Sequence, residues 1–166
     1  MKRYLSFSIV FYLILLFMSS CVKETDSILS EDTQLLGNWT ANEIKMLVAK
    51  PTSSSSMSIN SQNKRLVEFR GDNTAKGISA LFDSPTADWR YKMNKDELTL
   101  SSTLGGVVYL TVENKGNSMI WTMSDAQGIR SIKDSKGLSP AFPINYLKYT
   151  WEEIISMNME VEFVKN

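Results

Sequence analysis

The sequence predicts an all-β domain, an antiparallel barrel or sandwich of about seven short strands or slightly more. Two observations support this fold class. From residue 39 onward, apolar and polar side chains alternate in short runs, which is the period of a strand with one buried face. Clusters of Gly, Asn, Asp and Lys separate these runs and are typical of tight turns. Closing such a sheet removes exposed edges, which promote aggregation.

The strands of the first part follow from this alternation in chain order. Residues 39–49 are expected to form the first strand, and residues 50–63 a long mobile loop, because Pro51 and a run of serines interrupt the pattern. The clearest strand is 89–93, where large apolar residues share one face and charged residues the other. The run at 106–112 is apolar on both faces. The other strands are expected at 65–70 and 74–82, joined as a hairpin, and at 97–101 and 118–123.

The last part of the chain departs from this succession of strands. The stretch after the strands is rich in Gly and Pro and is expected to form loops, with one short strand at 129–133. Thr150 and Glu153 have the spacing of a capping box, which predicts a short helix over 151–157. A final alternating strand over 159–163 is expected to pair back with the first strand.

The N-terminus has the features of a secretory signal peptide in the usual order. Two basic residues precede an apolar run at 9–17, and the small residues Ser19 and Ser20 follow it. The run is shorter than the roughly eighteen residues that a membrane-spanning helix needs. We therefore expect residues 1–20 to be removed after export.

The only cysteine, Cys21, comes directly after this segment. Met18-Ser19-Ser20-Cys21 resembles the lipobox of bacterial lipoprotein precursors. The resemblance implies that Cys21 becomes the first residue of the mature chain. It also implies a diacylglyceryl group on the sulfur and usually a third acyl chain, such as palmitate, on the nitrogen. More than one acyl chain holds a protein stably at a membrane.

The resemblance to lipoproteins also implies a location in the cell envelope, anchored by lipid to the outer membrane. The charged pair Lys23-Glu24 resembles a tag that sends some lipoproteins to the cell exterior, so the periplasmic face and the cell surface both stay open. Residues 21–34 lack a sustained apolar period and are expected to form a flexible tether. The folded domain is then expected over residues 35–166.

The folded domain opens with the spacing Leu35-x-Gly37-x-Trp39. This spacing at the start of a first strand resembles that of the lipocalin-like domains of many bacterial lipoproteins. The resemblance implies a small antiparallel barrel of about eight strands. In this family the Gly permits a tight turn and the Trp closes the bottom of the barrel, which gives Gly37 and Trp39 structural roles. A late Arg stacks on that Trp, and here Arg130 and Lys165 are the two candidates.

The composition excludes several kinds of chemistry. The chain has no histidine, so neither serine-histidine catalysis nor a typical zinc site is expected. After removal of the signal peptide, acidic residues outnumber basic ones by two, which argues against nucleic acid as a partner. Adjacent carboxylates such as Glu152 and Glu153 point in different directions and do not converge on one substrate. We therefore expect no enzymatic activity, no metal and no cofactor.

Two functions fit these expectations. In the first, the barrel holds a small hydrophobic or sugar-like molecule, and large side chains that face the interior select it. In the second, the interior is solid, and an outer face or the serine-rich loop contacts an envelope or host protein. The candidate ligand-binding residues of the barrel interior are Phe69, Trp89, Tyr91, Tyr109 and Trp121.

Overall fold

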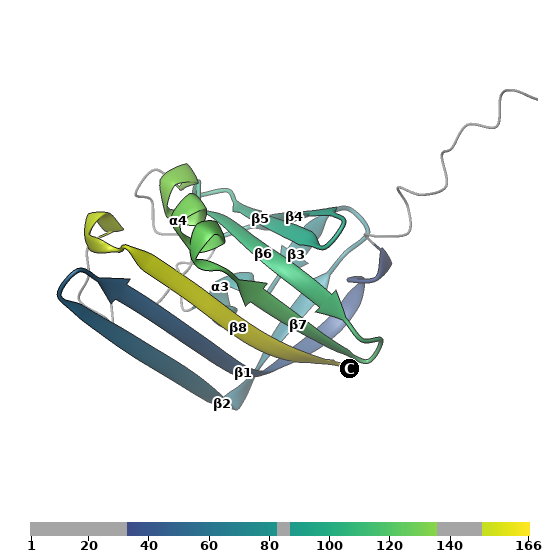
Figure 1. Cartoon of the computed structure of the whole chain (residues 1–166). Helices are drawn as coiled ribbons and strands as arrows, with labels where there is room; N and C mark the ends of the chain where they lie inside the picture. The colour runs from purple at the N-terminus through teal and green to yellow at the C-terminus, as the bar shows by residue number, and fades with distance from the viewer. Residues whose placement is uncertain (1–32, 83–86, 136–150) are drawn as a thin grey trace, which may run out of the picture. The chain divides into compact units, whose positions relative to one another are not determined.

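The computed structural model describes residues 33–82, 87–135 and 151–166, in which eight strands form a closed antiparallel barrel (Figure 1). Each strand pairs with the next along the chain, and the last pairs with the first. The prediction of an all-β, antiparallel barrel of about eight strands is therefore confirmed. The predicted signal peptide, Cys21 and most of the tether lie outside the described residues.

Most of the predicted strands are present with nearly the expected bounds. In particular, the final strand pairs with the first, for example Met159 with Met46 and Val161 with Ile44. The strands are β1 (Gly37–Lys50), β2 (Ser53–Phe69), β3 (Thr74–Lys76), β4 (Trp89–Asn94), β5 (Glu97–Ser102), β6 (Val107–Asn114), β7 (Ser118–Met123) and β8 (Ser156–Lys165). The described residues also form the helical segments α3 (Ile78–Leu81), α4 (Asp125–Asp134) and η1 (Trp151–Glu153).

The predicted loop over residues 50–63 is wrong, because β2 begins at Ser53. A two-residue turn, Pro51 and Thr52, closes a long hairpin in which Lys50 pairs with Ser53 and Gly37 with Phe69. Serine has little preference of its own in a sheet, and its pairing depends on the neighbouring strand. Here the neighbour is β1, in which buried and exposed side chains alternate. The backbone of β1 pairs with that of the serine run and holds it in the sheet.

A bulge in β1 decides which of its residues face the core. The register shifts between Ala41 and Glu43, so Asn42 is an extra residue relative to β8. Before the bulge Trp39 and Ala41 are buried, and after it the buried positions are Ile44, Met46 and Val48. The bulge thereby keeps an apolar face on the core side along the full length of β1.

The predicted return strand over 74–82 stops at Lys76, and the chain then turns into α3. Gly77 has φ +81°, and a Cβ at this position would lie 1.9 Å from the carbonyl oxygen of Leu66 in β2. Only glycine permits this close approach of two backbones. The approach directs Ile78, Leu81 and Phe82, all at most 1% exposed, into the core of the barrel.

The predicted strand at 129–133 is also wrong, because these residues belong to α4. Ser124 and Gln127 form a capping box, in which each side chain bonds to the backbone of the other. The same spacing at Thr150 predicted a helix over 151–157, but the structure has only the short η1 turn there, and β8 begins at Ser156. Pairing of Ser156 with Ala49 of β1 extends the strand at the expense of the helix.

Helix α4 completes the wall of the barrel where β7 has ended. The β6–β7 pairing covers only Thr111 to Asn114 of β6. Nearer the start of β6, the backbone N–H of Tyr109 donates to the hydroxyl of Ser131 at 3.0 Å, and that of Val107 donates to Ser135 at 2.9 Å. Ser131 of α4 and Ser135 at its C-cap therefore take the place of a neighbouring strand. Figure 1 shows the helix beside β6 and β8.

Candidate functional site

Four of the five candidate interior residues lie in the core of the barrel. Phe69 contacts two of them edge to face, with ring centroids 4.9 Å from Tyr91 and 5.8 Å from Trp121. Trp121 also lies 4.3 Å from the ring of Phe163. The hydroxyl of Tyr91 donates to the carbonyl of Arg70 at 2.7 Å. Trp89 completes the set, and its indole N–H donates to Ser79 of α3 at 2.9 Å.

The side chains around this aromatic cluster are packed against one another. A cavity that admits water would leave accessible surface on the side chains of its walls. Trp39, Trp121 and Leu98 are 0% exposed, and so are Leu100, Leu110, Met119 and Val161. Insertion of Phe82 and its neighbours from α3 adds further volume to the same core. Around these residues the interior is filled in the manner of a solid protein core.

One polar atom in this packed region has no partner. Within the part of the chain that the structure describes, the indole Nε1 of Trp121 is buried and makes no hydrogen bond. The atom has less than 1 Å² of accessible surface, so no water-sized space lies beside it. A buried donor without an acceptor costs about 1–3 kcal/mol. Trp121 therefore contributes through packing alone.

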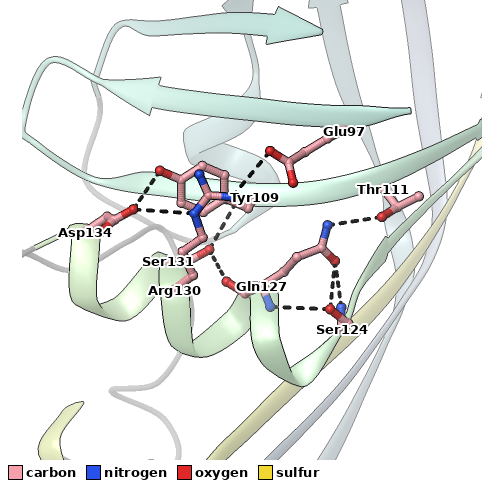
Figure 2. A network of polar contacts seen from close by, with 8 residues as sticks. All are labelled: Glu97, Tyr109, Thr111, Ser124, Gln127, Arg130, Ser131 and Asp134. Carbon is pink, nitrogen blue, oxygen red and sulfur yellow. Dashed lines mark hydrogen bonds and ion pairs between the residues drawn. The ribbon is translucent and has the colours of Figure 1, made fainter. Parts of the chain in front are cut away.

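Tyr109 does not face the interior, contrary to the prediction. Side chains alternate along a strand, and Val108, Leu110 and Val112 take the core side of β6. Tyr109 lies on the outer face, where α4 covers it and leaves it only 9% exposed (Figure 2). The two apolar faces of the run at 106–112 are thus explained by a barrel core on one side and a helix on the other.

The contacts of Tyr109 form a polar network with α4, shown in Figure 2. The Tyr109 hydroxyl donates to Asp134 at 2.7 Å, and the guanidinium of Arg130 lies 3.6 Å from the centre of the ring. Arg130 also reaches Glu97 of β5 at 3.4 Å and Asp134 at 3.7 Å. The hydrogen bond to Asp134, together with burial, raises the pKa of Tyr109 above its usual value. Each charge here has a partner, which favours a role in holding α4 in place.

The residues that resemble the lipocalin motif lie at one end of the barrel, which we call the floor end. The floor end holds the start of β1, the end of β8 and the β4–β5 and β6–β7 turns. Trp39 is 0% exposed, and its indole donates to the carbonyl of Leu35 at 2.7 Å. The ammonium of Lys165 lies 5.2 Å from the centre of this indole. Of the two candidate cations, Lys165 therefore stacks on Trp39, whereas Arg130 stacks on Tyr109. Gly37 has φ +116°, a backbone conformation that favours glycine.

Two hollows lie side by side at the floor end and share Gln34 and Asn114. The side chain of Asn114, which lines both hollows, donates to the carbonyl of Gln34 at 3.0 Å. The first hollow has a volume of about 310 Å³, and its lining is Gln34, Leu35, Met93, Lys95, Asp96, Val112 and Asn114. The second has a volume of about 390 Å³, and its lining is Thr33, Gln34, Asn114, Gly116 and Lys165.

Neither hollow was expected from the sequence. The lining residues of the two hollows come from the segment ahead of β1, from two turns and from the ends of β4, β6 and β8, which are far apart in the chain. Lys95 and Asp96 form an ordinary turn signal, and Gln34 was assigned to the flexible tether. Lys95 has φ +57°, which is unusual for a residue other than glycine or asparagine. This backbone conformation is visible only in the structure.

Comparison of the chain with protein-family models, curated proteins and solved structures found no match. Among the described residues, no group of Cys, Asp and Glu side chains is arranged to hold a metal ion. Nor does any helix within the described ranges have the length and apolar character to cross a membrane.

Proposed function

We propose that this chain is a membrane-anchored lipoprotein whose lipocalin-like barrel recognises its partner through its outer surface, without catalysis. The packed interior is the observation that carries the proposal. Among the described residues, Trp121 and the side chains around it are fully buried against one another, which leaves no space between them for a carrier's ligand. Ligand pockets of small barrels usually have volumes of roughly 300 Å³ or more.

The anchoring part of the proposal depends on the lipobox-like sequence that ends in Cys21. The described part of the chain enters β1 at the floor end through Thr33 and Leu35. The partner would be an envelope or host protein.

The absence of catalysis is proposed on chemical grounds. The chain has no histidine, and its one cysteine would be consumed by lipidation. Asp134 and Glu97, the two carboxylates of the polar network around Tyr109, both form ion pairs with Arg130. General acid and base catalysis needs groups that converge on one substrate.

Lipid anchoring is tested by Cys21→Ala in the native host. We expect the variant to keep its N-terminal segment uncleaved or to lose the lipid mass and leave the detergent-dependent membrane fraction. Ser20→Ala is the matched control, because it keeps a small residue at the preceding position and should behave like the unchanged protein. Fractionation and intact mass of both variants check this. A Cys21→Ala protein that still carries lipid and needs detergent would contradict the proposal.

The choice between a surface-recognition module and a carrier is tested by native mass spectrometry of protein extracted from its own membrane. A packed barrel is expected to show the mass of the processed, lipidated chain alone or with a protein partner. A stoichiometric small apolar molecule that stays bound through mild extraction would contradict the packed interior and favour a carrier.

A further inference from the structure

The first part of β2 has a neighbouring strand on one side only. Residues 53–60, which we call the edge segment, pair with residues 43–50 of β1. On the other side of β2, among the strands that the structure describes, the partner is β3, and it pairs only with Glu68 and Phe69. Figure 1 shows β1 and β2 as a long hairpin that continues past the short β3. The barrel is therefore closed by β3 at one end of β2, and the edge segment remains an open strand edge within the described sheet.

This edge has the backbone geometry that pairing with another strand requires. A strand with one antiparallel neighbour directs the N–H and C=O of every second residue away from that neighbour. Such a row of donors and acceptors is a template for a further extended chain. The regular part of the row ends after residue 60, because residues 61–64 lie opposite the single residue Asn42 of β1. The surface available for pairing is thus the edge segment itself.

The edge segment lacks the residues that usually prevent such pairing. Charged side chains and prolines commonly protect the edge strands of soluble proteins, and residues 53–60 contain neither. Charged residues are placed instead in strands that have neighbours on both sides, such as Arg90 and Lys92 in β4 and Glu160 and Glu162 in β8. The one open edge described here is therefore formed by an uncharged sequence.

We propose that two copies of this chain pair through their edge segments, antiparallel and about a two-fold axis. Such an axis places the same strand edge of both copies side by side, so each copy supplies the backbone groups that the other needs. Because residues 53–60 carry no charge, the two copies meet without repulsion between like charges. The inference does not depend on lipid anchoring or on the envelope or host partner proposed above, since the edge belongs to the barrel itself.

A second copy fits this edge better than a segment of a different protein does. When a foreign strand adds to a sheet, backbone hydrogen bonds supply the affinity and pockets for alternate side chains supply the specificity. The two hollows described above lie at the floor end, and neither is lined by a residue of β2. Pairing of identical edges needs no such pocket, because symmetry alone makes the two sides complementary.

The test is disulfide cross-linking in intact cells of the native host, with diamide as oxidant and the full-length chain. The edge segment offers serines that can be replaced one at a time by cysteine, a change of a single atom: Ser53→Cys, Ser54→Cys, Ser55→Cys, Ser56→Cys and Ser58→Cys. Each step away from the two-fold axis separates the two cysteines by about 7 Å along the strands, and a disulfide needs Cα atoms within roughly 7 Å. The yield of covalent dimer should therefore peak at one position or two adjacent positions, at least roughly fivefold above the more distant ones.

Two controls set the background of the cross-linking. Ser101→Cys is the matched variant, because Ser101 is an exposed serine of β5 that pairs with Arg90 of β4 and Val107 of β6. The unchanged protein, whose only cysteine is Cys21, is the second control. Yields no higher than these controls at all five positions would overturn the proposal, and so would equally high yields at all five, which indicate random collision. Cross-links to a different protein in place of the dimer would overturn it as well and assign the edge to that protein.

A second measurement does not depend on cysteine chemistry. A contact of one strand a side is small compared with the interfaces of stable dimers, so we expect a dissociation constant of roughly 10–100 μM in detergent solution, measured by analytical ultracentrifugation. Ser56→Lys places a charge in the middle of the edge segment and should raise this constant at least roughly tenfold, whereas Ser101→Lys should leave it unchanged. Circular dichroism checks that both variants keep the barrel. A protein that stays monomeric up to about 1 mM, or equal effects of the two lysines, would overturn the proposal.

Discussion

At the scale of single residues, two tryptophans with the same burial have different surroundings. Trp39 and Trp121 are both 0% exposed. Trp39 donates to Leu35 at 2.7 Å, whereas the Nε1 of Trp121 has no acceptor in the described structure. The sequence predicted a buried position for each but gave no basis for this difference, because the acceptor depends on how the segment ahead of β1 folds back.

Replacement of each tryptophan by phenylalanine separates packing from hydrogen bonding. Trp39→Phe leaves the carbonyl of Leu35 unpaired, whereas Trp121→Phe removes a donor that was already unpaired. We expect Trp39→Phe to destabilise the protein by about 1–2 kcal/mol more than Trp121→Phe does. Urea unfolding followed by circular dichroism measures the difference. Equal losses would show that the Trp39 hydrogen bond contributes nothing net.

Tyr109 gives a prediction about pH. The hydrogen bond to Asp134 and burial raise its pKa above 10.0, so its contribution to stability is complete below about pH 10 and is lost as pH rises through the pKa of the folded state. Tyr109→Phe should therefore be less stable than the unchanged protein near neutral pH, and this difference should shrink in strong alkali. Urea unfolding at about pH 8 and about pH 11 tests this. A difference that does not depend on pH would contradict it.

At the scale of elements, the strands with a clear alternation were predictable and the helical segments were not. The run at 89–93 became β4 because its own side chains determine its buried face. The segment after β7 forms α4, which packs against β6 and β8 where β7 has ended. The position of this gap in the barrel wall depends on the pairing of the whole sheet. The Ser124 capping box was a usable local signal for this helix. The same spacing at Thr150 predicted a longer helix than the η1 turn that forms there. A capping box therefore leads to a full helix only where the rest of the fold packs against that helix.

The close packing of α4 against β8 is tested at Gly128. A Cβ at this position would lie 2.1 Å from the carbonyl oxygen of Met157, a backbone atom that cannot easily move. Gly128→Ala should destabilise the protein by about 1–3 kcal/mol, although alanine is the better helix former. Gly71→Ala is the control, because nothing lies within 4 Å of its Cβ, and it should change stability by less than about 0.5 kcal/mol. Similar effects of the two would show that α4 does not depend on this contact.

At the scale of the whole molecule, closure of the barrel was predictable and its filling was not. Alternation in the strand over 159–163 and the opening motif around Trp39 both favoured a sheet that pairs its last strand with its first, as β8 and β1 do. Whether a closed barrel encloses space depends on what else enters it. Here Ile78 and Leu81 of α3 and Phe82 at its C-cap enter the core because Gly77 turns the chain against β2, and no periodicity of the sequence indicates that. The candidate interior residues were thus mostly placed correctly, but as packing partners of one another.

A barrel that is full should bind apolar molecules only after space has been made in it. Phe69 contacts the rings of Tyr91 and Trp121, so Phe69→Ala removes a ring from the centre of the core and leaves an apolar cavity. The variant should lose about 3–5 kcal/mol of stability and gain weak binding of benzene or indole, since apolar cavities of this kind stay dry and accept such ligands. The unchanged protein should bind neither compound, as measured by thermal shift and NMR. Binding to the unchanged protein with the affinity of the variant would mean that the interior already holds space, and the carrier function would then be favoured over recognition by the outer surface.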